Sequence, residues 1–163
     1  MSDTPVHNVH ATGLVLDGMG ILLRGPSGSG KSLLALALLE RAAIDGRIGC
    51  LVADDRIDLV RDGAGLLMRA PAAIAGLIEL RGRGIVARPH VDEARLHLVI
   101  DLVAELERMV EEDQLVTELF GVRLARAPVP RAGVVEMWHR LLLVEAALAA
   151  LSGDQSDPRQ KTT

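Results

Sequence analysis

The chain has 163 residues, enough for a single domain with a sizeable hydrophobic core. It is 49% hydrophobic but only 1% aromatic, so the core must be aliphatic and few rings remain for stacking single-stranded bases. The net charge of −4 likewise provides no broad basic surface for nucleic acid.

Signals for disulfides, secretion and membrane insertion are also missing from the sequence. Cys50 is the only cysteine, so an intramolecular disulfide is impossible and a reducing compartment fits. The first residues lack the basic start and apolar stretch of a signal peptide, and no uncharged apolar run is long enough to cross a bilayer. We therefore expect a cytoplasmic protein that binds neither nucleic acid nor membrane.

The first predicted elements are two strands joined by a tight turn. Apolar runs at residues 14–16 and 21–23 flank Asp17-Gly18-Met19-Gly20, and Asp-Gly is a strong hairpin signal. The second strand leads directly into a glycine-rich octapeptide at residues 25–32. Residues 33–43 follow as a predicted helix.

This octapeptide, Gly-Pro-Ser-Gly-Ser-Gly-Lys-Ser, matches the phosphate-binding pattern G-x-x-x-x-G-K-[ST] without a mismatch. Its glycines let the backbone wrap closely, so that consecutive N–H groups point at phosphate oxygens. We expect Lys31 to reach the β- and γ-phosphates of a nucleotide, and the Ser32 hydroxyl to ligate Mg²⁺. A glycine-rich turn without a ligand is the alternative, which the order of strand, loop and helix disfavours. The candidate nucleotide-binding residues are Gly25, Pro26, Ser27, Gly28, Ser29, Gly30, Lys31 and Ser32.

A pair of carboxylates, Asp54 and Asp55, follows the next predicted strand at residues 48–53. A carboxylate at the end of an apolar strand can hold Mg²⁺ or its waters, or accept a proton from an attacking hydroxyl. Successive side chains of an extended chain alternate in direction, so both carboxylates need not face one site. A solvated strand end is the alternative for this pair.

Residues 57–60 and 66–69 are predicted as a second hairpin, and Pro71 can open a short helix through residue 78. The next segment is Glu79-Leu80-Arg81-Gly82-Arg83-Gly84-Ile85, in which two glycines bracket an arginine. It suits a loop packed around an anion, with Glu79 near a metal ion. A plain turn fits this segment equally well.

The last part of the chain predicts strands at residues 95–103 and 121–127, with a charged run at 105–113 that indicates a solvated helix. Apolar spacing predicts a final helix over residues 133–151. We therefore expect an α/β fold in which helices pack on a mixed sheet. The prediction is one domain at residues 1–151 and a disordered tail at residues 152–163.

Three of these segments, in this order, resemble the catalytic domain of the HPr kinase/phosphorylase family. They are the octapeptide, Val-Ala-Asp-Asp at residues 52–55, and the segment at 79–85, which is close to the family's Glu-Ile-Arg-Gly-Leu-Gly-Ile. The resemblance implies a P-loop fold of the HPr kinase/PEP carboxykinase type. It also implies phosphorylation, with ATP and Mg²⁺, of a seryl residue of the phosphocarrier protein HPr. The reverse-type reaction, in which inorganic phosphate attacks phosphoserine and releases pyrophosphate, is implied as well, together with a homohexamer and a short form without the family's N-terminal domain.

The resemblance further implies roles for single residues. The catalytic residues would be His10, Lys31, Asp55 and Arg108, with Asp55 accepting the seryl proton. The Mg²⁺ ligands would be Ser32 and Glu79, with Asp54 helping to organise the metal. The chain departs from the family at Leu33, where glutamate is frequent, and at Arg83. Its loop at residues 128–133 has a displaced arginine, which weakens the implied phosphorylase activity more than the kinase activity.

Two other functions stay open at this point. A small-metabolite kinase would usually carry a long arginine-rich lid segment, and the sequence has none. A nucleotide-binding regulatory switch that no longer transfers phosphate would be favoured by loss of Asp55 or Lys31, and both are present.

Overall fold

The structure, a computed structural model, describes residues 4–153. This part of the chain forms strands, two α-helices and two short 3₁₀ turns. In chain order these elements are β1 (Val6–Val9), β2 (Ala11–Leu16), β3 (Met19–Arg24), α1 (Lys31–Ile44), β4 (Gly49–Ala53), β5 (Ile57–Asp62), β6 (Gly65–Arg69), η1 (Ala72–Ile74), β7 (Leu77–Leu80), β8 (Gly84–Ala87), β9 (Glu93–Val103), η2 (Glu112–Leu115), β10 (Val116–Leu119), β11 (Val122–Pro130) and α2 (Met137–Ser152).

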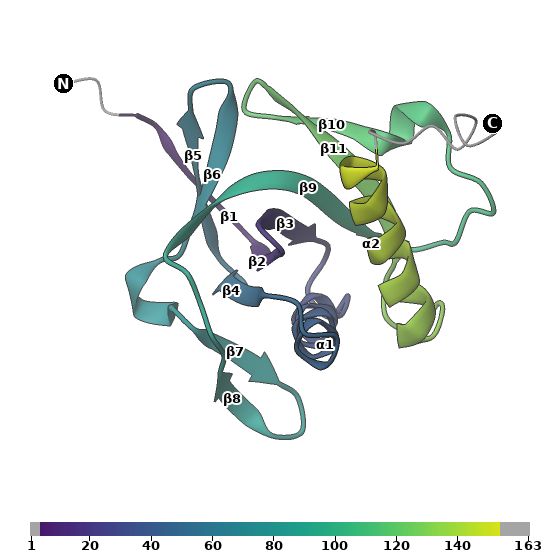
Figure 1. Ribbon diagram of the computed structural model, residues 1–163, viewed down its shortest axis with the longest axis horizontal. Coiled ribbons are helices and arrows are strands. Elements are labelled where there is room, and N and C mark those ends of the chain that lie inside the picture. The colour runs from purple at the N-terminus through teal and green to yellow at the C-terminus, as the bar shows by residue number, and fades with distance from the viewer. Residues whose placement is uncertain (1–3, 154–163) are drawn as a thin grey trace, which may run out of the picture.

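Most of the strands join in one mixed sheet, as predicted. Its order is β1-β5-β6-β9-β3-β2-β4, with β11 added on β9 and β10 on β11. β9 holds the sheet together, because its first residues pair with β6 and its later residues pair with both β3 and β11. Figure 1 shows this long strand arching across the sheet. The pairings of β9 with β3 and β11 are parallel, and the other pairings between named strands are antiparallel.

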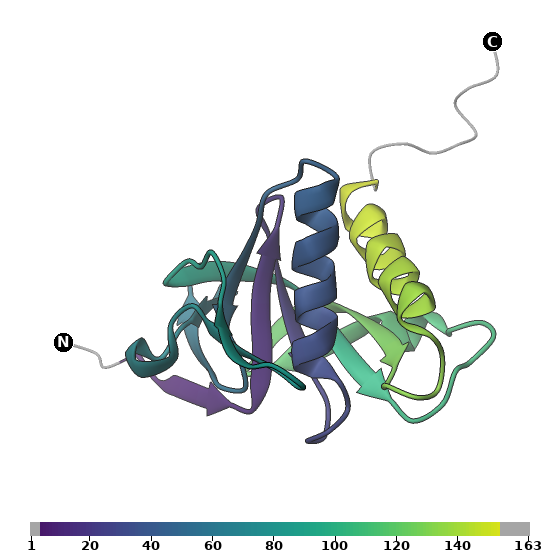
Figure 2. The same ribbon diagram turned by 90° about the horizontal axis from the view of Figure 1, so that it is seen from below.

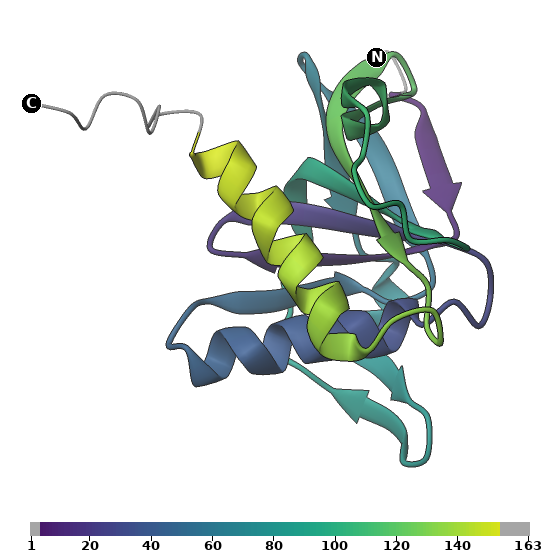
Figure 3. The same ribbon diagram turned by 90° about the vertical axis from the view of Figure 1, so that its right-hand side faces the viewer.

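Two aliphatic clusters lie on opposite faces of the curled sheet. On one face, α1 and α2 lie side by side (Figure 2) and pack their apolar sides on β2, β3 and β11. On the other face, β5 and β6 cover apolar residues of β3 and β9. β7 and β8 pair only with each other, and their hairpin extends beyond the sheet near α1 (Figures 1 and 3).

The strand directions bring several chain segments to one edge of the sheet. β3, β9 and β11 end there because they are parallel, and β4 ends there because it is antiparallel to β2, which is antiparallel to β3. The residue before β2 lies at the same edge for the same reason. Backbone hydrogen bonds link these ends: Arg131 N donates to Val103 O at 2.8 Å, and Ala132 N donates to Ser29 O at 3.0 Å. Ligands of open α/β sheets bind at the carboxyl ends of the strands.

The predicted strands and the helix after the octapeptide are confirmed, with shifted boundaries. The strand predicted at residues 121–127 extends to Pro130, and β1 and β10 have no predicted counterpart. The final helix begins at Met137 and not at residue 133. Gly133 has a φ of 89°, which places it in the left-handed region and outside a right-handed helix.

Two local predictions between residues 71 and 113 are wrong, and in a third segment the structure agrees with one of two alternatives. The helix predicted from Pro71 is only the turn η1, because Gly76 then takes a φ of 74° and the chain continues as β7. The segment at 79–85 contains the turn of the β7–β8 hairpin at residues 81–83, which agrees with the plain-turn alternative. The charged run at 105–113 forms no helix. Leu106 and Met109 are exposed there, so no apolar face is buried that could stabilise one.

Within residues 4–153, no helix is long and apolar enough to cross a membrane. Ser152 is the last residue of α2, so the first residue of the predicted tail is helical, and Gly153 follows it. Its remaining part, residues 154–163, lies outside the described residues.

Candidate functional site

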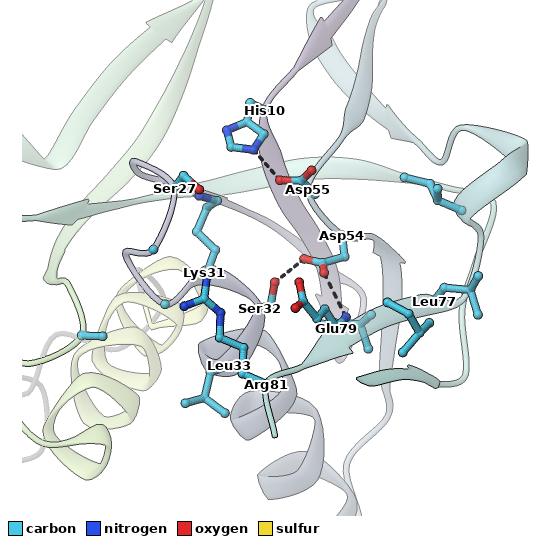
Figure 4. Close-up of a pocket in the computed structure, with 16 residues that line it drawn as sticks. His10, Ser27, Lys31, Ser32, Leu33, Asp54, Asp55, Leu77, Glu79 and Arg81 are labelled. Carbon is cyan, nitrogen blue, oxygen red and sulfur yellow. Dashed lines mark hydrogen bonds and ion pairs between the residues drawn. The ribbon is translucent and has the colours of Figure 1, made fainter. Parts of the chain in front are cut away.

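An open cleft of about 610 Å³ lies at the edge of the sheet where β3, β4, β9 and β11 end. It gathers most of the predicted site residues from four segments of the sequence (Figure 4). Those that line it are His10, Ser27, Gly28, Gly30, Lys31, Ser32, Asp54, Asp55 and Glu79. The glycine-rich loop (residues 25–32) forms one side of the cleft, and the β7–β8 hairpin forms the other.

The glycine-rich loop depends on backbone conformations and close contacts that only glycine accepts. Gly30 is the N-cap of α1 and has a φ of 90°, so the loop enters the helix through a left-handed residue. A Cβ on Gly25 would lie 2.7 Å from Ser29 Oγ and 2.9 Å from Leu102 Cβ. The first residues of α1 line the cleft. The N–H groups at the amino end of a helix and the helix dipole favour an anion there.

Lys31 is folded back on the glycine-rich loop. Its ammonium donates to Gly25 O at 2.7 Å and to Pro26 O at 3.1 Å, and the residue is buried. Burial lowers the pKa of Lys31, while the negative charges of Asp55 and Asp54 oppose this shift. Two neutral carbonyl oxygens thus hold the ammonium next to the loop. An anion would bind it more strongly and could replace them.

Asp54 is buried and held by hydrogen bonds on both of its oxygens. Oδ1 accepts from Thr12 Oγ1 at 2.8 Å and from Ser32 Oγ at 2.7 Å, and Oδ2 accepts from the Glu79 N–H at 3.3 Å (Figure 4). This carboxylate therefore ties β2, α1 and β7 together at the floor of the cleft. Its orientation is fixed before any ligand arrives.

The oxygen atoms around Asp54 fit a small, hard cation. Ser32 Oγ touches the Asp54 carboxylate, and the exposed Glu79 carboxylate lines the same cleft. Within residues 4–153, no three His, Cys, Asp or Glu side chains converge to hold a metal by themselves. This set fits Mg²⁺, which is usually bound by one or two carboxylates and completed by waters and substrate phosphates.

Asp55 is separated from Asp54 by an unusual backbone turn. Its φ of 70° sends the side chain away from Thr12 and Ser32, toward the rim of the cleft. There Asp55 Oδ1 pairs with His10 Nε2, and the side chains are 65% and 49% exposed. The two adjacent carboxylates thus differ in setting: Asp54 is buried and accepts three hydrogen bonds, whereas Asp55 is exposed at the rim.

The far side of the cleft is mostly apolar. Ile74, Leu77 and Ile85 come from η1 and the β7–β8 hairpin, and Leu33 comes from the first turn of α1. Leu33 and Ile85 are more than half exposed. Arg81, at the turn of the hairpin, is the basic residue of this side.

Some predicted residues do not reach the cleft. Arg108 lies in the exposed loop after β9 and does not line it. From the segment at residues 128–133, Ala132 reaches the cleft, whereas Arg131 is exposed outside it.

Two buried polar residues behind the cleft belong to no sequence motif. Thr12 holds Asp54, and Arg140 donates to Ser29 O of the glycine-rich loop at 3.4 Å. Each is a polar residue in an apolar pattern. Thr12 lies on the same face of β2 as Leu14 and Leu16, and Arg140 shares the buried side of α2 with Val144 and Leu148. A polar residue at a core position is the signal that could have found them.

The cleft can neutralise several negative charges and accept a proton. Lys31, the loop N–H groups and the amino end of α1 provide positive potential on one side, and Asp55 provides an exposed base on the rim. These are the parts that phosphoryl transfer requires: positioning, charge stabilisation and a base for the attacking hydroxyl.

Comparison with known proteins gives one consistent result. Residues 3–150 match the family described as "HPr Serine kinase C-terminal domain". The HPr kinase/phosphorylase proteins of Burkholderia cenocepacia (strain HI2424) and Paraburkholderia phymatum are each 32% identical over 156 residues, which is 88% of this chain and 45% of each relative. The chain thus spans less than half the length of these curated relatives.

Among solved structures, the Hpr(Ser) kinase/phosphatase of Coxiella burnetii is 29% identical, with a TM-score of 0.71. The match covers 91% of this chain and 99% of that one. The glycine-rich loop, the two carboxylates and the hairpin carrying Glu79 thus lie in a sequence and a fold that both lead to the same conclusion. The chain belongs to the HPr serine kinase C-terminal domain family.

Proposed function

We propose that this domain transfers the γ-phosphoryl group of ATP to a seryl hydroxyl of HPr. The observation that carries the proposal is the division of labour between Asp54 and Asp55. Asp54 is buried and hydrogen-bonded on both oxygens beside Ser32, whereas Asp55 stands at an open rim within reach of a protein substrate. A small-metabolite kinase would instead need to enclose its acceptor against water.

In this proposal the glycine-rich loop binds the nucleotide phosphates. The backbone N–H groups of residues 25–32 and the amino end of α1 surround them. Lys31 exchanges its loop carbonyl partners for phosphate oxygens and stabilises charge on the transferring group. Ser32, Asp54 and Glu79 would hold Mg²⁺, which supplies neutralisation of the phosphate charge when bound.

Asp55 would accept the proton of the seryl hydroxyl as the new P–O bond forms. A serine hydroxyl is a poor nucleophile at neutral pH, so a carboxylate within hydrogen-bond distance helps the attack. His10 orients Asp55 through their mutual hydrogen bond, and both lie at the same rim. The exposed position of the pair matches an acceptor that is presented on the surface of another protein.

The same cleft would carry the reverse-type reaction. Inorganic phosphate would occupy the glycine-rich loop and attack the phosphorus of phosphoserine, so that its P–O bond to serine breaks. Asp55 would give a proton to the departing seryl oxygen, and pyrophosphate would be the product. Arg108 would be a further catalytic residue. Only the family resemblance supports this role, because the loop that carries Arg108 lies outside the cleft. A homohexamer acting on HPr is the assembly proposed on the same ground.

A variant at Asp55 separates nucleotide binding from transfer. Asp55→Asn should retain the wild-type Kd for Mg·ATP in calorimetry, because Asp55 is absent from the glycine-rich loop. Transfer of labelled phosphate to HPr should fall by about 10²–10⁴-fold, the usual contribution of a general base. Asp92→Asn is the matched control, since it removes an exposed carboxylate outside the cleft. Near wild-type transfer by Asp55→Asn would remove Asp55 from this role.

A further inference from the structure

Arg140 is a buried cation at the back of the glycine-rich loop. It lies in the first turn of α2 and is only 2% exposed. Its Nε donates to Pro130 O at 2.8 Å, and its Nη2 donates to Ser29 O at 3.4 Å. The guanidinium therefore bridges the end of β11 and the glycine-rich loop.

Within the described part of the chain, residues 4–153, this guanidinium has no carboxylate partner. Among residues 4–153, none of the ion pairs includes Arg140, and its third contact is Met137 Sδ at 3.9 Å. Burial lowers the pKa of Arg140, but an arginine stays charged at neutral pH. Buried charges in proteins are normally paired, because desolvation of an isolated ion is costly. An uncompensated positive charge in this place calls for an anion nearby.

The position of the charge is directly behind Gly30, which lines the cleft. A Cβ on Gly30 would lie 3.3 Å from Arg140 Nη2, 3.4 Å from Nη1 and 3.0 Å from Ala132 Cβ. Only one peptide unit therefore separates the guanidinium from the space in which the proposed phosphates would bind.

The hydrogen bonds of Ser29 O fix the direction of that peptide unit. This carbonyl accepts from Ala132 N at 3.0 Å and from Arg140 Nη2 at 3.4 Å, so two donors hold it in one orientation. In a trans peptide the C=O and the following N–H point in opposite directions. Drawing the Ser29 carbonyl toward Arg140 on α2 thus turns the N–H of Gly30, a residue that lines the cleft, away from α2.

We infer that Arg140 is a positioning residue for the glycine-rich loop, which orients the Gly30 N–H toward the phosphates and adds positive charge behind it. The phosphates would then serve as the counter-charge that the protein itself does not provide. The inference rests on the proposed nucleotide binding but not on the identity of the phosphoryl acceptor.

Binding of inorganic pyrophosphate with Mg²⁺, measured by calorimetry on the full chain, tests this role without any phosphoryl transfer. Arg140→Gln removes the charge and should raise the Kd by about tenfold or more, the usual effect of losing a charged hydrogen-bond partner. Arg140→Lys keeps the charge but not the planar fork, so its Kd should lie between those of wild type and Arg140→Gln. Arg123→Gln is the matched control. It makes the same charge change at an exposed site about 23 Å of strand away from Pro130, at roughly 3.3 Å per residue, and its Kd should stay within about twofold of wild type.

The lysine variant distinguishes this role from a merely structural one. A structural role would lower the melting temperature of both Arg140 variants and leave the Kd of the folded protein unchanged. A folded Arg140→Gln protein with wild-type affinity for pyrophosphate would overturn the inference. Equal losses of affinity in Arg140→Gln and Arg140→Lys would overturn the part of it that assigns a role to the positive charge. If Arg140→Gln does not melt cooperatively, Arg140→Lys decides, with a loss of about threefold expected and an unchanged Kd as the contrary result. Wild-type protein that binds pyrophosphate without phosphorylating HPr would count against the proposed function alone.

Discussion

The substitution Thr12→Val tests whether the floor of the cleft is organised by the Thr12 hydroxyl. Thr12 is fully buried, donates to Asp54 Oδ1 at 2.8 Å, and accepts from the Asp55 N–H at 3.4 Å. Valine has nearly the same shape, so no cavity forms and only the hydroxyl is lost. A hydrogen bond to a charged group contributes about 1.5–3 kcal/mol. The free energy of unfolding should therefore fall by about 2–3 kcal/mol, because the bond from Asp55 is long and adds little.

Thr12→Ser is the matched comparison, because it keeps the hydroxyl and removes one buried methyl group. That loss should cost about 1 kcal/mol. Urea unfolding of both variants gives the free energies, and titration with Mg·ATP shows whether the orientation of Asp54 is preserved. The serine variant should bind Mg·ATP like the wild type, and the valine variant about tenfold more weakly. A valine variant as stable as the serine variant, with unchanged affinity for Mg·ATP, would refute this reasoning.

Two further changes probe the loop and the sheet beneath it. Gly25→Ala should lower stability by about 1–3 kcal/mol and weaken Mg·ATP binding, because its Cβ would overlap Ser29 and Leu102. Thermal melting measures the loss of stability and calorimetry measures the Kd for Mg·ATP. An unchanged Kd would contradict this prediction. Asp101→Asn should cost about 2–4 kcal/mol in urea unfolding, because it strands two arginines that Asp101 binds at 2.7 Å or less. Burial raises the pKa of Asp101, but the hydrogen bonds and positive charges of the two arginines lower it by more. The pKa therefore lies below its ordinary value of 3.8. The stability difference between Asp101→Asn and wild type should therefore be full above about pH 3.8 and shrink as the pH falls through the lower folded-state pKa. A difference independent of pH would speak against the ion pairs.

The parts of the site carried by local sequence patterns were predictable. An octapeptide that follows an apolar strand and precedes a helix fixes its own conformation, since glycines such as Gly30 permit the required φ. The mixed sheet followed from apolar runs separated by Asp-Gly turns. Asp54 and Asp55 were placed correctly because a carboxylate after a buried strand must lie at the sheet edge.

The rest depends on contacts between residues distant in the sequence. The helix predicted from Pro71 included the start of β7, and the pairing of β7 with β8 on either side of the turn was not predicted, since Pro71 and the glycines at residues 82 and 84 suit several local structures. Thr12 and Arg140 have meaning only through Asp54 and Ser29, which lie 42 and 111 residues away. The alternation of an extended chain already allowed Asp54 and Asp55 to point in different directions, but the positive φ of Asp55 was not predicted.

The intact mass of purified HPr, after incubation with Mg·ATP and this protein, tests the proposed function most directly. We predict a gain of one phosphoryl group on a seryl residue. It should be absent with Lys31→Ala, which removes the cation held on the glycine-rich loop. Asp92→Asn should leave the gain unchanged. An HPr mass that does not change, with phosphate transferred instead to a small metabolite or to no acceptor, would contradict the account.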